Sequence, residues 1–362
     1  MSNAATATIN LDALRFNLLQ VRTRAPASKI MAVIKANAYG HGITQVASAL
    51  SNVVDAFAVA QFQEAIKLRK TGFSQRIILL QGFADAQQLH TLSELDIDTV
   101  IHQFEQLYIL QSTELEQPIH GWIKMDTGMH RLGFSIDQFN DVYEQLLKCK
   151  SIKEKPCCLS HFSNADDQSN QKTNVQIALF KKLTRSIAVE KSIANSAGIL
   201  AWPDSHFEWI RPGIMLYGIS PFANQYGKDL GLQPVMTLRA NVIAIQAIKK
   251  GEKIGYGEMW QASIDTKIAV LGIGYGDGYP RNAATGTPIF ISGIECPLIG
   301  RVSMDSICID IGEHEISVGD VATLWGDELP VEKIAAAAAT IPYELVCRVT
   351  ERVPRKMKES HG

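Results

Sequence analysis

The chain has 362 residues and a formal net charge of −2, with 46% hydrophobic and 20% charged residues. This balance is typical of a soluble globular protein with a large core, and the length favours two domains. Because the charge is near neutral and the only local basic cluster lies at 352–358, a broad basic surface for nucleic acid is excluded.

From residue 11 onward, short apolar runs alternate with amphipathic stretches. We predict strands at 30–34, 56–60, 76–81, 97–101, 119–125, 156–161, 192–195 and 207–211. Between them, apolar residues recur at helical spacing in 43–51, 63–71, 86–94, 104–112, 136–148 and 175–188. Strands separated by helices pair in parallel, and eight such strands can close a barrel. The predicted fold class is therefore α/β, a (β/α)8 TIM-type barrel, with a doubly wound open sheet as the alternative.

After Gly218 the pattern changes to glycine-punctuated β runs, at 237–247, 267–273, 287–291, 294–299, 306–311 and 321–325. Alternation such as Ile307, Ile309 and Ile311 is typical of half-buried antiparallel strands. One helix is predicted near 331–339, and only a residual tail beyond it. The polar, glycine-bearing segment 224–232 marks the boundary. We therefore expect a barrel domain over 1–230 and a mainly antiparallel β domain over 231–362.

Six cysteines are scattered through the chain, and none of them forms a CxxC pair. Cys157 and Cys158 are adjacent and have apolar or small neighbours, so we expect free thiols rather than disulfides or metal ligands. Residues 1–30 contain several charged side chains and no apolar signal segment, and no apolar run approaches the ~20 residues of a membrane span. We therefore expect a cytoplasmic location.

Lys35 directly follows the apolar run 30–34 and precedes small residues, a tyrosine and two glycines. In a parallel barrel it would lie at the carboxyl edge of the sheet, where barrel enzymes place their reactive groups. Burial at that edge disfavours the charged form of lysine and makes its amine a nucleophile. The plain alternative is a surface lysine after a core strand, which is the more common use of such a residue.

Other polar residues occupy equivalent places after predicted strands: Lys124, Asp126, Arg131, His161, Asn195, Ser196 and Arg211. Taken singly, such a residue is more often part of a hydrogen-bonded scaffold than a catalyst, but their joint place on one rim favours a site. The sequence lacks an HExxH motif, zinc-type Cys/His spacing, a GxSxG elbow and a Walker or GxGxxG loop that opens a helix. A metalloenzyme, a serine hydrolase and a nucleotide-binding protein are therefore disfavoured.

Nine segments in chain order carry a family resemblance: AVIKANAYGHG around Lys35, KMDTGMHRLGF (124–134), HFSNAD (161–166), NSAG (195–198), RPGIMLYG (211–218), GYG (255–257), GYGDGYPR (274–281), GRVSMD (300–305) and IPYELVC (341–347). The set resembles the alanine racemase family over nearly the whole chain. The lysine segment alone is shared, in looser form, by other pyridoxal-phosphate barrels.

The resemblance implies a homodimeric isomerase that interconverts L-alanine and D-alanine through an external aldimine of its cofactor, pyridoxal 5′-phosphate. Lys35 would bind the cofactor covalently and act as one of two bases. Arg211 would hydrogen-bond the pyridine nitrogen and, because a guanidinium keeps its protons, leave that nitrogen unprotonated. The other implied cofactor-binding positions are Tyr39, His161, Asn195, Ser196, Gly213, Ile214 and Tyr343.

The second base implied by the resemblance is Tyr256, which would reach the cofactor of the other subunit and be supported by a hydrogen bond from His161. Arg131 and Met304 match positions that contact the substrate carboxylate. The implied supporting residues are Lys124, which matches a lysine carbamylated in many relatives, and Tyr275 and Asp305, which match the second subunit's contribution near the entrance.

Two other functions fit parts of the pattern. A pyridoxal-phosphate decarboxylase of similar architecture would keep an acidic partner for the pyridine nitrogen, where this chain offers Arg211. A non-catalytic cofactor-binding barrel would resemble the first domain alone, whereas 231–362 follow it here. The sequence leaves open whether D-alanine is made or broken down, how strictly alanine is preferred, and whether Lys124 is carbamylated.

Overall fold

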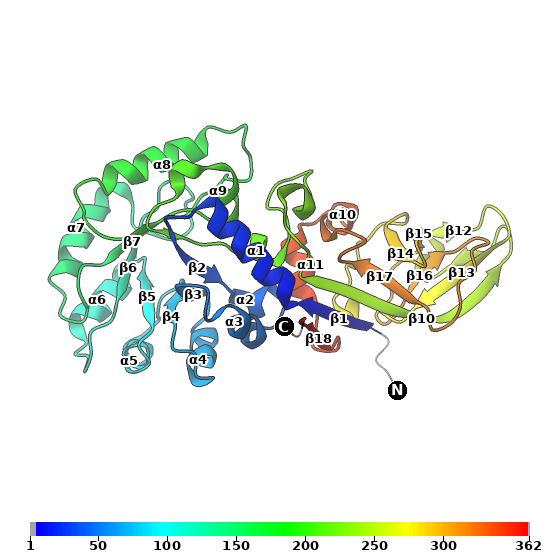
Figure 1. Ribbon diagram of the computed structural model, residues 1–362, viewed down its shortest axis with the longest axis horizontal. Coiled ribbons are helices and arrows are strands. Elements are labelled where there is room, and N and C mark those ends of the chain that lie inside the picture. The colour runs from blue at the N-terminus through cyan, green and yellow to red at the C-terminus, as the bar shows by residue number, and fades with distance from the viewer. Residues whose placement is uncertain (1–4, 361–362) are drawn as a thin grey trace.

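The computed structural model describes residues 5–360, and its first part is a closed barrel of eight parallel strands (Figure 1). The strands are β2 (Lys29–Val33), β3 (Ala56–Val59), β4 (Arg76–Leu79), β5 (Asp98–Ile101), β6 (Gly121–Lys124), β7 (Cys157–Leu159), β8 (Lys191–Ser192) and β9 (Trp209–Ile210). Lys29 of β2 pairs with Trp209 of β9, which closes the ring. The predicted (β/α)8 barrel is thus confirmed, and the open-sheet alternative is wrong.

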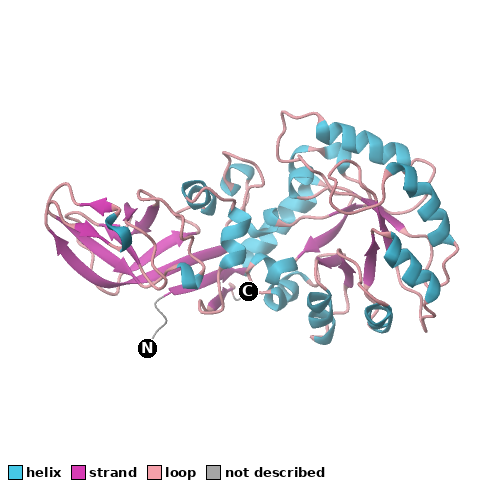
Figure 2. Cartoon of the chain, turned by 180° about the vertical axis from the view of Figure 1, so that it is seen from behind, coloured by secondary structure: helices cyan, strands magenta, loops and turns pink. Residues whose placement is uncertain are grey.

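Helices cover the outside of the barrel (Figure 2). They are α1 (Leu11–Arg24), α3 (Ile43–Leu50), α4 (Phe62–Lys70), α5 (Ala86–Glu94), α6 (Phe104–Ser112), α7 (Ile136–Leu147), α8 (Lys172–Leu183) and α9 (Ser196–Ala201), with the single turn α2 (Lys35–Tyr39) directly after β2. Short 3-10 turns follow at η1 (Pro203–Ser205), η2 (Ile214–Tyr217) and η3 (Gly227–Leu230). The six helices predicted between the strands correspond to α3 through α8.

The second part is an eight-stranded sheet in the order β13-β16-β15-β14-β17-β10-β1-β18. Its strands are β1 (Ala5–Asn10), β10 (Met236–Ile248), β13 (Thr266–Leu271), β14 (Pro288–Ile291), β15 (Ile294–Ile299), β16 (Ile307–Asp310), β17 (Val321–Trp325) and β18 (Arg355–Lys358). A separate pair is formed by β11 (Lys253–Ile254) and β12 (Trp260–Gln261), and the remaining elements are η4 (Tyr256–Glu258), η5 (Tyr275–Asp277), α10 (Val331–Ala337) and α11 (Pro342–Arg348). The predicted antiparallel β domain is confirmed.

The first and last strands of the chain meet in this second sheet. β1 pairs antiparallel with β10 and parallel with β18, so the chain enters the barrel through α1 from the sheet side (Figure 1). The sequence predicted none of β1, β18 and α11. The domain division at residue 230 stays a prediction. It groups β1 with the barrel, whereas β1 pairs with strands of the second sheet. Residues 1–4 and 361–362 of the two predicted domains lie outside the described residues.

A cluster of aromatic and ionic side chains closes the amino end of the barrel. The Arg76 guanidinium lies over the rings of Trp122 and Trp209, at 5.5 and 5.6 Å from their centroids. Arg76 Nε donates to the buried Asp98 carboxylate at 2.6 Å, and Trp122 Nε1 donates to the same oxygen at 3.0 Å. Trp122, Trp209 and Asp98 are buried, and the Asp98 carboxylate is paired with Arg76, so these side chains fill this end of the barrel. A ligand site is therefore left to the opposite, carboxyl end.

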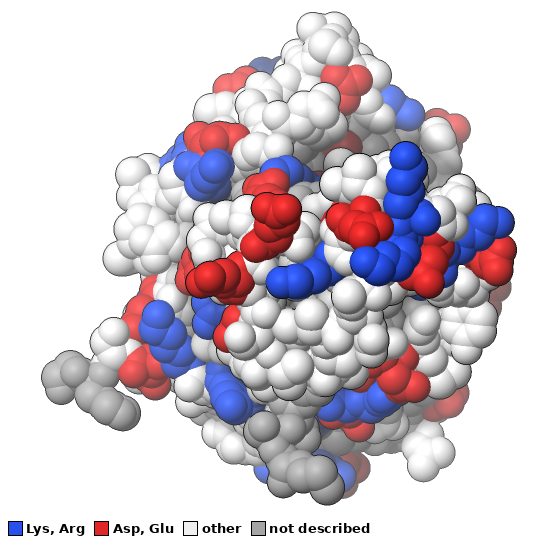
Figure 3. Space-filling view, turned by 90° about the vertical axis from the view of Figure 1, so that its right-hand side faces the viewer, with Lys and Arg blue, Asp and Glu red and all other residues white. Residues whose placement is uncertain are grey.

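The surface and the cysteines agree with the composition. On the face of the β-rich part shown in Figure 3, basic and acidic side chains are interspersed. No helix within residues 5–360 combines the length and the apolar character needed to cross a membrane. The six cysteines are unpaired, as predicted.

Candidate active site

A cavity of about 440 Å³ opens at the carboxyl ends of the barrel strands. Its walls come from segments that follow the barrel strands, and α11 closes one side. The predicted site residues that line it are Lys35, Tyr39, Lys124, Arg131, His161, Asn195, Ser196, Arg211, Gly213, Ile214 and Tyr343. The fold thus gathers residues from distant parts of the sequence around one space.

The cavity is strongly cationic. Among the described residues that line it, the charged side chains are Lys35, Lys124, Arg131 and Arg211, and none is acidic. Burial and the neighbouring guanidinium groups lower the pKa of Lys124 to about 8. Burial first, and then Arg131, also lower the pKa of Lys35 below its ordinary value. The cavity therefore suits an anionic ligand and holds an amine that loses its proton more readily than a free lysine.

The buried Arg211 side chain is held by oxygens and by a histidine. Its Nη1 donates to Ser192 Oγ and its Nη2 to the Ser160 carbonyl, both at 2.6 Å, while Nη2 lies 3.2 Å from His161 Nδ1. A guanidinium has only donors, so Nδ1 accepts and the His161 proton lies on Nε2. Burial, together with Arg211, keeps the pKa of His161 well below its usual range. His161 is therefore a neutral donor, and no carboxylate within residues 5–360 pairs with Arg211.

Gln176 of α8, which was not predicted as a site residue, holds the backbone around His161 by hydrogen bonds. Its Nε2 donates to the His161 carbonyl and to Thr127 Oγ1, each at 3.1 Å, and its Oε1 accepts from the Ser163 amide at 3.0 Å. The side chain is buried, so these bonds are not exchanged with water. A polar residue within a helical pattern gives no sequence signal of such a role.

The chain makes a left-handed turn directly after Lys35. The residues from Ala36 to Tyr39 have φ between 51° and 54°, and none of them is glycine. The left-handed region costs a non-glycine residue roughly 1–2 kcal/mol. Four in succession therefore require contacts from outside the turn to offset several kcal/mol. The sequence predicted a loop here but not its handedness.

Contacts at the end of the turn hold it in place. Arg355 Nε donates to the Gly40 carbonyl at 2.6 Å, and His41 Nδ1 lies 3.0 Å from the Ala38 carbonyl and 2.9 Å from that of Tyr39. A Cβ added to Gly40 would lie 2.0 Å from the Val346 carbonyl of α11. Position 40 therefore requires glycine, because α11 packs directly against the turn.

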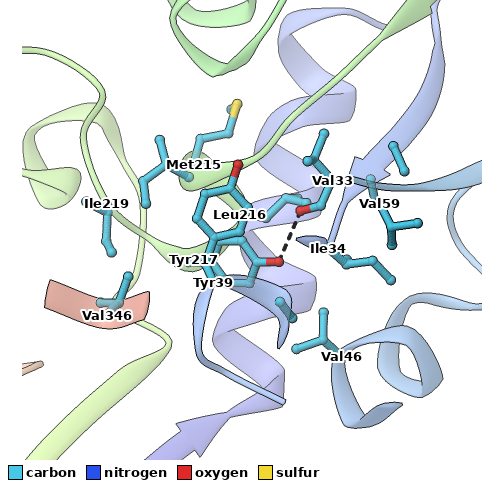
Figure 4. Close-up of a cluster of buried hydrophobic side chains, with 14 of the residues drawn as sticks. Val33, Ile34, Tyr39, Val46, Val59, Met215, Leu216, Tyr217, Ile219 and Val346 are labelled. Carbon is cyan, nitrogen blue, oxygen red and sulfur yellow. Dashed lines mark hydrogen bonds between the residues drawn. The ribbon is translucent and has the colours of Figure 1, made fainter. Parts of the chain in front are cut away.

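The Tyr39 hydroxyl lies close to Gly213 at one end of the cavity. Its ring packs on that of Tyr217, with centroids 4.9 Å apart, and the Tyr217 hydroxyl donates to the Val33 carbonyl at 3.1 Å (Figure 4). A Cβ added to Gly213 would lie 2.6 Å from the Tyr39 hydroxyl. The Gly213 amide donates to Ser196 Oγ at 2.9 Å. Two hydroxyls and an amide thus converge where only a glycine fits.

Four predicted site residues lie elsewhere, on the β-rich part: Tyr256, Tyr275, Met304 and Asp305. None of them lines the cavity. Tyr256 and Met304 have 70% and 51% of their surface exposed. Tyr275 and Met304 lie on adjoining segments, because the Tyr275 amide donates to the Ser303 carbonyl at 3.0 Å. The structure therefore sorts the predicted site into a cavity group and an exposed group.

Acidification should destabilise the fold through His41, which is buried and stacked on Tyr217. Burial lowers the pKa of His41 from its ordinary 6.5 to about 4. Between these two pKa values, His41 binds a proton in the unfolded chain but not in the folded chain. The stability present above pH 6.5 is therefore lost as the pH falls towards 4. Between pH 7 and 5 we expect His41 to remove about 2 kcal/mol from the free energy of unfolding. Urea unfolding of the wild type and of His41→Gln at both pH values measures this, and equal losses in the two proteins would contradict it.

Comparisons with known proteins agree with this geometry. Family models match the N-terminal domain of alanine racemase over residues 9–221 and its C-terminal domain over 235–357. The alanine racemase of Aeromonas hydrophila is 48% identical over 351 residues, which is 97% of this chain and 98% of the relative.

Two solved structures share the whole architecture. The biosynthetic alanine racemase from Pseudomonas aeruginosa has a TM-score of 0.96 and 39% identity, covering 99% of this chain and 100% of that one. The alanine racemase from Bartonella henselae, solved with covalently bound pyridoxal phosphate, has a TM-score of 0.89 and 29% identity, covering 99% of this chain and 100% of that one. The chain therefore belongs to the alanine racemase family.

Proposed function

We propose that this chain interconverts L-alanine and D-alanine with pyridoxal 5′-phosphate held at Lys35. The observation that carries the proposal is a lysine of lowered pKa in a cavity that contains three further cations and, among the described lining residues, no acid. The reaction named for the relatives from Aeromonas hydrophila and Pseudomonas aeruginosa supports the same substrate.

The residues of the cavity fit this cofactor. The Tyr39 and Ser196 hydroxyls lie beside Gly213, where the missing Cβ leaves space, and two hydroxyls next to such a space suit a phosphate group. Arg211 offers donors and no acceptor, which suits an unprotonated pyridine nitrogen. We expect Asn195, Ile214 and Tyr343, which line the same cavity, to complete the binding site. The Bartonella henselae relative holds the cofactor covalently, and Lys35 is the amine that would do so here.

Each face of the substrate needs its own proton carrier, because racemisation removes a proton on one side and returns it on the other. When bound, pyridoxal phosphate supplies an electron sink that acidifies the α-carbon of an attached amino acid. Lys35 would take or return the proton on one face. Arg131 would hold the substrate carboxylate, with Lys124 supporting Arg131. Arg211 keeps its proton, so the pyridine nitrogen would stay unprotonated and the cofactor would withdraw electrons less strongly. A weaker electron sink suits a racemase better than a decarboxylase or an aminotransferase.

The second proton carrier would be Tyr256 from another copy of the chain. Tyr256 is exposed and does not line the cavity of its own chain. His161, a neutral donor at Nε2, would hydrogen-bond the phenol. Met304, Tyr275 and Asp305 would come from the same second copy, with Met304 near the substrate carboxylate. A symmetric homodimer that exchanges these residues would complete two equal sites.

The Pseudomonas aeruginosa relative is a biosynthetic enzyme, which supports a role in supplying D-alanine for peptidoglycan. Six unpaired cysteines support a reducing compartment, so we place the reaction in the cytoplasm.

The proposal is tested by turnover of a panel of L-amino acids with purified, cofactor-loaded protein, followed by circular dichroism and by a coupled D-amino-acid oxidase. We expect L-alanine and D-alanine each to converge on an equal mixture, because enantiomers have the same free energy in water. Release of carbon dioxide without inversion would support a decarboxylase instead. Cofactor uptake without turnover of any amino acid would support a non-catalytic binding protein.

A further inference from the structure

We propose that Glu64 is a positioning residue, whose carboxylate clamps the left-handed turn at 36–39 and thereby sets the directions of Lys35 and Tyr39. The inference rests on the proposed function, because it takes Lys35 as the cofactor-binding amine and Tyr39 as a phosphate ligand.

The Glu64 carboxylate joins two neighbouring loops of the barrel rim. Its Oε2 accepts from the amides of Ala60 and Gln61, both at 3.1 Å, at the start of α4. Its Oε1 accepts from the Ala36 amide at 2.6 Å, with the Asn37 amide at 3.4 Å. One half-buried side chain therefore ties the segment after β2 to the segment after β3.

Capping of α4 does not require both oxygens. In α7 the equivalent residue of the capping box is Gln138, which accepts from the Ser135 amide at 3.0 Å through the single oxygen of its amide. In α4 the second oxygen points to another segment, and its partners are the first two amides of the turn. The charge of Glu64 strengthens these bonds relative to those of a neutral acceptor. Capping of α4 therefore does not explain the bonds that Glu64 accepts from the Ala36 and Asn37 amides.

The turn needs support at the end that Glu64 occupies. Arg355 and His41 bind carbonyls at its far end, between residues 38 and 40. Within residues 5–360, Glu64 provides the only side-chain acceptor for the Ala36 and Asn37 amides. Both residues are exposed, so without Glu64 water would be the competing partner.

Relaxation of the turn would change the cavity directly. If the residues after Lys35 returned to the right-handed region, the chain would leave the strand in a different direction. The Tyr39 hydroxyl would then move away from Gly213, where a Cβ would lie only 2.6 Å from it. Glu64 also acts on Lys35 through its charge, since it raises the pKa of Lys35 against the effect of burial and Arg131. Both effects reach the cofactor through other residues, because Glu64 does not line the cavity.

The test compares Glu64→Ala and Glu64→Gln with Gln138→Ala, which removes the corresponding side chain of a capping box on α7. Glu64→Gln keeps the size of the side chain and has one carbonyl oxygen for two pairs of amides. Three quantities are measured on the full chain: the dissociation constant of pyridoxal phosphate by equilibrium dialysis, the pKa of Lys35 in the cofactor-free protein, and the Tm. The pKa is obtained from the pH dependence of reductive methylation of Lys35, followed by peptide mass spectrometry.

We expect both Glu64 variants to bind pyridoxal phosphate about tenfold or more weakly than the wild type. The pKa of Lys35 should fall in both variants, and Gln138→Ala should lower the Tm without changing either quantity. Unchanged cofactor affinity in both Glu64 variants, or the same loss in Gln138→Ala, would overturn the positioning role. If the wild type itself bound no pyridoxal phosphate, the proposed function would fail instead, so the two failures are distinguishable. Should Glu64→Ala not fold, the isosteric Glu64→Gln decides the question.

Discussion

Lys35→Ala should abolish alanine racemisation, with a loss of about 10⁴-fold or more in kcat/KM. The expectation follows from the two roles proposed for one amine, which would both anchor the cofactor and move a proton at the α-carbon. Burial and the neighbouring Arg131 prepare that amine by lowering its pKa. The measurement is racemisation by circular dichroism, together with the absorbance of the bound cofactor, which should lose the band of the covalent form.

Lys29→Ala is the matched control for this variant, because Lys29 lies at the opposite end of the same strand, β2. Its exposed ammonium pairs with Glu190, and such surface pairs contribute about 0–1 kcal/mol. We expect Lys29→Ala to keep its activity and its cofactor. A small primary amine added to Lys35→Ala should restore part of the proton transfer but not the covalent anchor. Racemisation by Lys35→Ala at the wild-type rate without added amine would show that the lysine has been assigned wrongly.

The barrel could be predicted because each of its strands carries a local signal. A run such as 30–34 is apolar on both faces, as a strand covered by helices must be, and a helical stretch follows it. Even the two-residue strand β9 lies within a predicted strand, 207–211, whereas β8 overlaps the predicted strand 192–195 only at Ser192. The rim residues followed from the same rule, since a polar side chain after a buried parallel strand lies at the carboxyl edge.

The missed elements depend on partners that are distant in sequence. β18 is a run of basic residues around Met357, which has no strand pattern of its own and is ordered by pairing with β1. The segment from Ala36 to Tyr39 contains two alanines, which favour a right-handed helix, and only Asn37 is of a type enriched in the left-handed region. The side chains of Glu64, His41 and Arg355 bind its backbone and stabilise it in this conformation. The motif Gln61–Glu64 could have suggested a capping box, but it could not have shown that one carboxylate oxygen serves another loop.

The contact between Arg211 and His161 depends both on local sequence signals and on partners distant in sequence. Each residue could be placed at the rim from its own strand, but their 3.2 Å approach depends on the barrel closing around both. That approach fixes the His161 proton on Nε2 and leaves His161 a donor for a phenol. Tyr256 does not line the cavity of its own chain, so its proposed role requires a second copy of the chain.

Tyr256→Phe should separate proton abstraction from inversion. If Lys35 serves one face and Tyr256 the other, the variant keeps a base for one enantiomer and lacks the group that would return a proton on the opposite face. In deuterium oxide, the α-proton of one enantiomer should therefore still exchange, while racemisation falls by about 10²–10⁴-fold. Proton NMR follows the exchange, and chiral chromatography follows the inversion. Tyr108→Phe, which changes another exposed tyrosine on the barrel helix α6, should leave both rates unchanged. Equal loss of exchange in both enantiomers would contradict the two-base assignment.

Mixing the two inactive proteins tests where Tyr256 acts. In a dimer with Lys35→Ala in one copy and Tyr256→Phe in the other, one site contains both changes and the other contains neither, provided that Tyr256 serves the cavity of the second copy. After dissociation and random reassociation of equal amounts, about half of the dimers are mixed, so activity should recover to about a quarter of the wild-type value. If Tyr256 served its own cavity, every site in every dimer would carry one change and no activity would return. The 70% exposure of Tyr256 and its absence from the lining of its own cavity favour recovery.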